Sequence, residues 1–143
     1  MSKMLILRGI SGWYAGRKWE RGALFEEPAL EYAKRRGYEG KVLDISGEAY
    51  KGSPQSKLAL STYRDDSTIT ALYGFSGGGY NIYHIINGMT KPQKDRLQLV
   101  VVLGAPKLKQ SSVQGSWEVV YRLDPPGGHM DGPRALLAEL DKK

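Results

Sequence analysis

The feature that most constrains this chain is a regular alternation of short apolar segments with segments of helical periodicity. The apolar segments predict strands over residues 3–8, 41–45, 68–73, 97–103 and 117–123, and helices are predicted over residues 23–36, 56–64, 80–86 and 133–140. Strands separated by helices form right-handed crossovers and a mainly parallel sheet. The continuous apolar run 99–103 fits a central strand that is buried on both faces. Only the connection from Leu103 to Trp117 lacks a clear helical pattern.

This alternation runs through the whole chain without an internal repeat, a linker or a low-complexity segment. A length of 143 residues is near the usual size of one domain. The sequence therefore predicts a single α/β domain over residues 1–143.

Composition narrows the possible functions. The chain has no cysteine, which excludes disulfides, thiolate nucleophiles and cysteine-based zinc sites. The net charge of +6 and the pI of about 9.5 are compatible with an anionic partner. However, the basic residues are scattered, and no basic stripe interleaved with aromatic residues is present. We therefore expect a solvated basic surface and no nucleic-acid partner.

Neither of two apolar runs predicts an association with membranes. Met4–Leu7 is too short for the core of a signal peptide, and Leu99–Leu103 is far too short to span a bilayer. The expectation is a cytoplasmic protein with no membrane partner.

The most informative segment is a glycine-rich turn in which Gly74, Ser76 and Gly78 satisfy the pattern G-x-S-x-G. A predicted strand runs directly into this turn and a predicted helix runs directly out of it, as a nucleophile elbow requires. In so sharp a turn the serine backbone is strained, and side chains two residues before and two after would collide with neighbouring backbone. The N–H of Gly77 would then face a developing oxyanion at the helix start.

Two other readings of these glycines stay open. They allow close packing at a strand-to-helix turn, or they cradle a phosphate at a helix N-terminus. Neither the dinucleotide fingerprint G-x-G-x-x-G nor the Walker lysine accompanies the turn. The elbow is the interpretation that we favour.

Only two histidines are available as a general base. His84 lies in the predicted helix after Ser76, beside isoleucines, and is expected to be a packed or surface residue. His129 lies in a loop between the last strand and the last helix, after Gly127 and Gly128. We therefore expect His129 to be the base, with an exposed turn histidine as the alternative.

The elbow Gly74–Gly78, together with a late Gly-Gly-His129 before a terminal helix, resembles the α/β-hydrolase family of esterases and lipases. The resemblance implies a trimmed three-layer sandwich with helices on both faces of a five-stranded sheet, in the order 2-1-3-4-5. In that order the segment after the first strand, which includes Ile10 and Ser11, faces Ser76 across the switch point. His129 follows the fifth strand, roughly 10 Å away at about 4.8 Å per strand.

The triad acid departs from the family pattern, because one strand is missing between the usual positions of the acid and the histidine. Asp124 closes a strand at the carboxyl end of the sheet and is the acid that we expect. Asp131 is better explained as the N-cap of the last helix, since Gly132 and Pro133 follow it. A Ser–His dyad without an acid remains an alternative.

The resemblance implies a serine hydrolase that acts on a small ester, thioester or activated amide through an acyl-enzyme. The oxyanion donors would be the N–H groups of Gly77 and of Ile10 or Ser11, while Trp13 and Tyr14 would line a substrate pocket. No metal or organic cofactor is expected. The alternatives are a non-catalytic binding protein on the same scaffold and a flavodoxin-like phosphate-ligand-binding domain.

Overall fold

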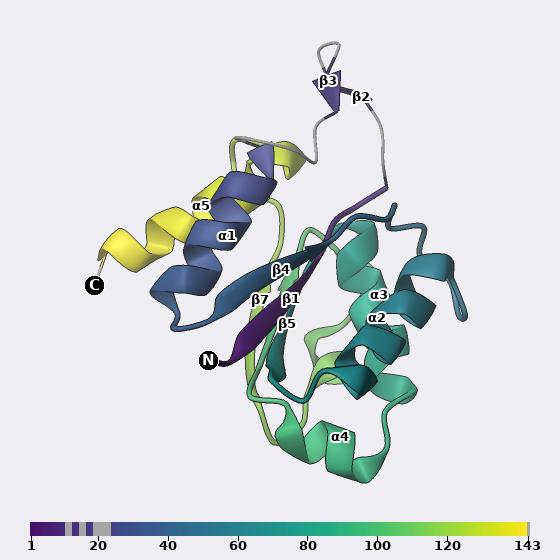
Figure 1. Ribbon diagram of the computed structural model, residues 1–143. Helices are drawn as coiled ribbons and strands as arrows, with labels where there is room; N and C mark the ends of the chain where they lie inside the picture. The colour runs from purple at the N-terminus through teal and green to yellow at the C-terminus, as the bar shows by residue number, and fades with distance from the viewer. Residues whose placement is uncertain (11–12, 15–16, 19–23, 143) are drawn as a thin grey trace.

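The computed structural model describes residues 1–10, 13–14, 17–18 and 24–142, with backbone only at 13–14 and 17–18 (Figure 1). The main sheet contains β1 (Lys3–Leu7), β4 (Glu39–Leu43), β5 (Ile69–Phe75), β6 (Leu99–Leu103) and β7 (Glu118–Arg122), and a two-stranded antiparallel sheet pairs β2 (Trp13–Tyr14) with β3 (Arg17–Lys18). The helices are α1 (Glu26–Arg35), α2 (Pro54–Asp65), α3 (Gly77–Asn87), α4 (Lys91–Arg96) and α5 (Gly132–Glu139), and short 3₁₀ turns lie at Gln110–Val113, His129–Asp131 and Leu140–Lys142.

The main sheet is parallel throughout, in the order β4-β1-β5-β6-β7. When its strands are counted along the chain, this order is 2-1-3-4-5, so the predicted topology is confirmed. The order reverses between β1 and β5, which places the segment after β1 beside the end of β5. A crevice at such a switch point is where open α/β sheets usually bind ligands.

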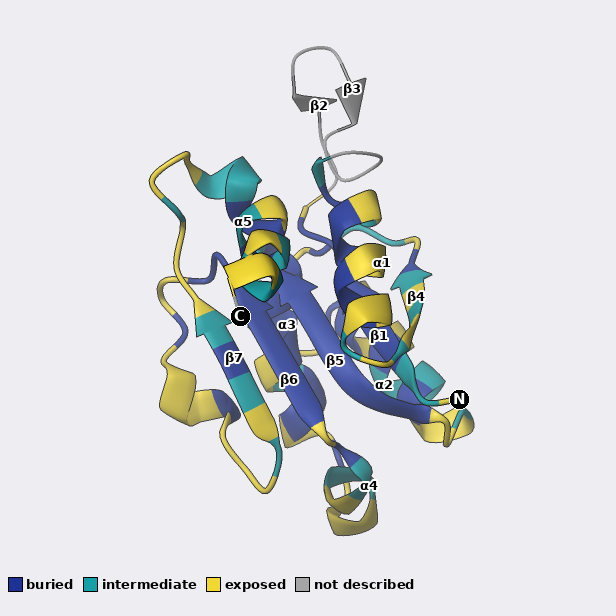
Figure 2. Ribbon diagram, turned by 90° about the vertical axis from the view of Figure 1, so that its left-hand side faces the viewer, coloured by how far each residue is buried: buried dark blue, intermediate teal, exposed yellow. Residues whose placement is uncertain are grey.

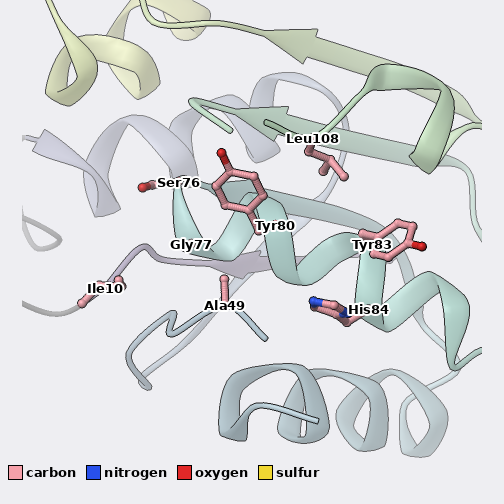
Figure 3. Close-up of a pocket in the computed structure, with 8 residues that line it drawn as sticks. All are labelled: Ile10, Ala49, Ser76, Gly77, Tyr80, Tyr83, His84 and Leu108. Atoms are coloured by element: carbon pink, nitrogen blue, oxygen red, sulfur yellow. The ribbon is translucent and has the colours of Figure 1, made fainter. Parts of the chain in front are cut away.

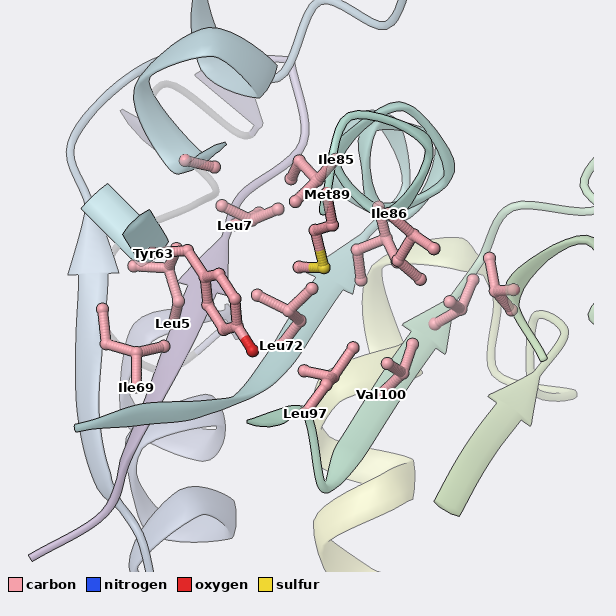
Figure 4. Close-up of a cluster of buried hydrophobic side chains, with 14 of the residues drawn as sticks. Leu5, Leu7, Tyr63, Ile69, Leu72, Ile85, Ile86, Met89, Leu97 and Val100 are labelled. Atoms are coloured by element: carbon pink, nitrogen blue, oxygen red, sulfur yellow. The ribbon is translucent and has the colours of Figure 1, made fainter. Parts of the chain in front are cut away.

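Helices cover both faces of the sheet, with α1 and α5 on one side and α2 and α3 on the other (Figure 1). Alternate residues of β1 supply the two cores, because neighbouring side chains of a strand point to opposite faces. Leu5 and Leu7 join the core under α2 and α3, drawn in Figure 4, whereas Met4 and Ile6 join the core under α1 and α5. The three central strands are almost fully buried, and the outer strands β4 and β7 are only partly covered (Figure 2).

One helix was not predicted. α4 has no buried residue and therefore no apolar periodicity, but Thr90 caps its start with a reciprocal capping box to Gln93. The 3₁₀ turn Gln110–Val113 lies within the connection from Leu103 to Trp117, where no helix was expected. It buries Val113, and the Val113 carbonyl accepts a hydrogen bond from the Trp117 indole at 2.8 Å.

Ion pairs and side-chain hydrogen bonds hold the amino ends of the strands. Lys3, the first residue of β1, lies 3.1 Å from the carboxylate of Asp66, which also accepts the backbone N–H of Thr68 at 3.0 Å. These contacts lower the pKa of Asp66 to about 2, with the Thr68 hydrogen bonds as the largest cause and Lys3 next. Arg96 stacks on the Tyr63 ring at 3.9 Å from its centroid and donates to the carbonyl of Ile69.

In the part of the chain that is described, no helix combines the length and the apolar character needed to cross a membrane.

Candidate active site

Ser76 occupies the turn between β5 and α3 with a strained backbone. Its φ of 57° and ψ of −118° make it the one non-glycine residue with a positive φ among the described residues. A conformation of this kind costs about 1–3 kcal/mol and persists only when the surroundings enforce it. Two backbone hydrogen bonds hold this conformation. The N–H of Ser76 donates to the carbonyl of Leu103 at 2.8 Å, and the carbonyl of Ser76 accepts the N–H of Tyr80 at 3.1 Å. The strain that the motif predicted is present.

The glycines around Ser76 are required by close backbone approach. A Cβ built on Gly74 would lie 2.5 Å from the carbonyl oxygen of Gly78, and one built on Gly78 would lie 2.4 Å from that of Leu7. At Gly77 the nearest atom would be the carbonyl oxygen of Gly47, at 1.9 Å. No side chain fits at these distances. The prediction that glycine is needed two residues before and two residues after Ser76 is therefore confirmed.

The first turn of α3 presents backbone donors beside the serine hydroxyl. Gly77 is the first residue of the helix, so its N–H has no acceptor within the helix. The helix dipole adds a partial positive charge at this end. Ile10 lines the same pocket as Ser76 and Gly77, which agrees with its expected position across the switch point. Ser11, the other expected donor, lies outside the described residues.

His129 and Asp124 form a hydrogen-bonded pair at the same end of the sheet. The Nδ1 atom of His129 lies 2.7 Å from the Asp124 carboxylate, and the two side chains are 39% and 40% exposed. A carboxylate only accepts, so Nδ1 carries the proton and Nε2 of a neutral ring is left to act as a base. The pair that the sequence predicted is thus brought together.

Two residues position His129 close to the elbow. Its ring stacks on Phe75, the residue before Ser76, with 4.8 Å between the centroids. Gly104 lies beneath it with a φ of 63°, and a Cβ there would come within 2.8 Å of His129 and 3.1 Å of Asp124. Gly104 follows Leu103, the acceptor of the Ser76 N–H. Asp124, His129 and the serine turn therefore share one small region at the carboxyl ends of β5 and β6.

Asp131 stands at the N-cap position of α5, as predicted, with Gly132 and Pro133 opening the helix. The expected capping hydrogen bond is absent, because the φ of −87° and ψ of −3° of Asp131 are helical and its side chain makes no such bond. The carboxylate instead pairs with Arg134, on the first turn of α5. A local ion pair has replaced the cap. No hydrogen bond between Asp131 and His129 is among the contacts of the described residues.

A buried polar network fixes the segments that face the elbow. The Gln55 side chain donates to the carbonyl of Arg8 at 2.9 Å, and Asn81 of α3 donates to Gln55 at 2.9 Å and to the carbonyl of Glu48 at 3.0 Å. Gln55 and Asn81 are fully buried, where unpaired amides would be costly. These hydrogen bonds hold Arg8, just after β1, and Glu48, in the loop after β4, against α3.

A pocket of about 450 Å³ opens beside Ser76 (Figure 3). We call it the α3 groove, and its walls are Ile10, Ala49, Ser76, Gly77, Tyr80, Tyr83, His84 and Leu108. Partial burial, and next to it the charge of Lys51, lowers the pKa of His84 below its usual value of 6.5, which favours the neutral form of the ring. The hydroxyl oxygen of Tyr80 accepts the N–H of Lys107 at 3.0 Å.

This groove was not predicted from the sequence. The predicted pocket residues were Trp13 and Tyr14, whose side chains lie outside the described residues, and His84 was expected only to be a packed or surface residue. The available signal was the spacing of Gly77, Tyr80 and His84, which places all three on one face of a helix. Ala49 and Leu108 come from loops and carry no such signal.

No group of three or more metal-ligating side chains comes together within the described residues. The sequence matches no protein-family model, and no curated protein matches it significantly.

Proposed function

We propose that this protein is a serine hydrolase of α/β-hydrolase type that acts on a small ester, thioester or activated amide. Ser76 is the nucleophile, His129 the general base and Asp124 the acid that orients it. The observation that carries the proposal is the strained conformation of Ser76 next to Phe75, on which His129 of a hydrogen-bonded His–Asp pair stacks. Strain of this kind is retained where function requires it.

In acylation, Ser76 Oγ attacks the substrate carbonyl carbon while Nε2 of His129 takes the hydroxyl proton. The N–H of Gly77 donates to the oxyanion, and one such donor is worth about 2.7–4 kcal/mol of transition-state stabilisation. The tetrahedral intermediate then collapses. The bond to the leaving group breaks, and the leaving group takes the proton from His129.

In deacylation, a water molecule attacks the acyl carbon and gives a proton to His129. The bond from the acyl carbon to Ser76 Oγ breaks, the serine recovers its proton from His129, and the carboxylic acid leaves. Throughout both steps Asp124 keeps the proton on Nδ1 and stabilises the imidazolium form. Each of these roles needs only residues already described.

The two alternatives predict different behaviour. A binding protein on this scaffold would not react at Ser76, and a phosphate-binding domain would bind nucleotide or flavin at the first turn of α3. The second alternative is less well supported, because neither the dinucleotide fingerprint G-x-G-x-x-G nor the Walker lysine accompanies the turn.

A fluorophosphonate probe tests the proposal. We expect a single adduct on the intact protein, located on Ser76 by peptide mass spectrometry and absent from Ser76→Ala. His129→Ala should slow the labelling at least 10²-fold, the usual contribution of a general base. Ser61→Ala is the matched control, since its hydroxyl only donates to the carbonyl of Leu58 on α2.

Labelling at another serine, or none under conditions that label a known esterase, would reject the proposal. A folded protein that resists the probe and copurifies with a nucleotide or flavin would favour the phosphate-binding domain. A folded protein that does neither would favour the binding protein.

A further inference from the structure

The α3 groove follows one face of its helix away from the nucleophile. Figure 3 shows Tyr80 and His84 projecting from α3, with Ile10 and Ala49 approaching from one side and Leu108 from the other. At 1.5 Å of rise per residue, the distance along α3 from Gly77 to His84 is about 10 Å. One end of the groove is therefore the reacting serine and the other end is at Tyr83 and His84.

The position of the base indicates which part of a substrate the groove would receive. The leaving group must take its proton from His129, so it has to face that residue. His129 lies over Phe75 and Gly104, and neither it nor Asp124 lines the groove. Around the tetrahedral carbon, the acyl substituent is the group directed away from the base. The groove begins at Ser76 and runs along α3, whereas His129 stacks on Phe75, which belongs to the core under α1 and α5. This arrangement suits an acyl subsite.

The chemistry of the walls indicates what kind of acyl group fits. Ile10, Ala49 and Leu108 are aliphatic, and among the described residues no wall residue is an aspartate, glutamate, lysine or arginine, although the chain carries a net charge of +6. The Tyr80 hydroxyl oxygen already accepts the N–H of Lys107. A charged acyl group would lose part of its hydration without meeting an oppositely charged side chain among the described wall residues, which is unfavourable.

The walls are also held in place. The hydroxyl of Tyr121 donates to the carbonyl of Leu108 at 2.6 Å, and the N–H of Leu108 donates to Ala105 at 3.0 Å. On the opposite side, Asn81 holds the carbonyl of Glu48, the neighbour of Ala49. A volume of about 450 Å³ is within the usual range for a small-molecule site.

We propose that the α3 groove is the acyl-binding subsite and that it selects neutral, apolar acyl groups, either alkyl chains of medium length or aromatic groups. This inference rests on the proposed hydrolase function. It predicts that reactivity at Ser76 rises with the apolar surface of the acyl group and falls when that group carries a charge.

The test uses p-nitrophenyl phosphonates that differ only in the group on phosphorus: methyl, hexyl, benzyl or carboxypentyl. In each reaction Ser76 Oγ forms a bond to phosphorus, p-nitrophenolate leaves, and the serine proton passes through His129 to solvent. We expect the hexyl or benzyl probe to label at least about tenfold faster than methyl, the gain expected when several methylenes leave water. The carboxypentyl probe should lose this gain.

Ala49→Trp fills the groove from an exposed loop position, while Ala138→Trp on α5 adds the same side chain on the opposite face of the sheet. Ala49→Trp should slow labelling by the hexyl and benzyl probes much more than labelling by the methyl probe, and so remove their advantage. Ala138→Trp should change neither rate. Tyr83→Ala, at the far end, should shift the preference toward longer alkyl chains, and thermal melts check that each variant is folded.

The outcomes separate the two proposals. Equal rates for the methyl, hexyl and benzyl probes, or a loss in Ala49→Trp that is the same for all of them, would overturn the acyl groove while Ser76 remains the nucleophile. Failure of every probe to label Ser76 would overturn the proposed hydrolase function, and the acyl groove with it. Preference for benzyl over hexyl would identify an aromatic acyl group, and the reverse an alkyl chain.

Discussion

The carboxyl and amino ends of the same five strands are built in different ways. At the carboxyl end, Ser76 and Gly104 hold positive φ angles, and the His129–Asp124 pair is partly open to solvent. At the amino end, Lys3, Asp66 and Thr68 satisfy one another in ordinary conformations. One end stores strain beside polar groups, and the other uses polar groups to hold strands together. The difference agrees with the catalytic role that we propose for the carboxyl end and with a stabilising role for the amino end.

Replacing Ser76 tests this comparison most severely. Ser76→Gly and Ser76→Ala should each lower kcat for ester hydrolysis by roughly 10⁶-fold, because both lack the nucleophile. The glycine variant should nevertheless be the more stable of the two by about 1 kcal/mol, since only alanine keeps a Cβ at a φ of 57°. Urea unfolding of the two variants measures this difference. Equal stabilities would mean that the elbow is not strained.

Replacing Asp124 tests whether this residue orients the His129 ring or stabilises the fold. Asp124→Asn should lower kcat by up to about 10⁴-fold by favouring the wrong tautomer of His129, with an unchanged melting temperature. Asp131→Ala is the control, because it removes an exposed ion pair with Arg134 and no cap. It should cost at most about 1 kcal/mol and leave kcat intact. A loss of activity in Asp131→Ala alone would transfer the role of the acid to Asp131.

The smallest effect is expected at the amino end. Because the folded-state pKa of Asp66 is lowered to about 2, its carboxylate contributes stability above its unfolded pKa of about 3.9, and this contribution is lost as the pH falls through about 2. Asp66→Asn should therefore be less stable than the parent at pH 7, with a difference that shrinks between pH 4 and pH 2. Unfolding curves at several pH values measure it, while kcat at pH 7 should not change. A difference independent of pH would contradict the assignment.

The parallel sheet could be predicted because buried parallel strands leave continuous apolar runs, as in 99–103, and the order of its strands was what the resemblance to α/β-hydrolases implied. The serine turn could also be predicted. Neighbouring backbone packs so closely against Gly74 and Gly78 that only glycine fits at these positions, and this requirement produces the G-x-S-x-G pattern in the sequence. α4 was missed because it buries nothing. Its capping box from Thr90 to Gln93 was the remaining signal.

The groove and the cap of α5 depend on details that a sequence pattern does not contain. Ala49 and Leu108 meet across α3 only after two loops have folded back onto it. Asp131 has the residue type and position of a cap, but the preceding 3₁₀ turn gives it a helical backbone and its carboxylate pairs with Arg134. Tertiary context decided both cases.

The placement of His129 and Asp124 on one short loop has a consequence for how the protein would lose activity on heating. Two of the three proposed catalytic side chains are only five residues apart and are attached to the body largely through Phe75 and Gly104. Such a loop opens at a lower free energy than the buried strands beneath it. Local opening would remove acid and base together, so inactivation would precede global unfolding and would reverse on cooling.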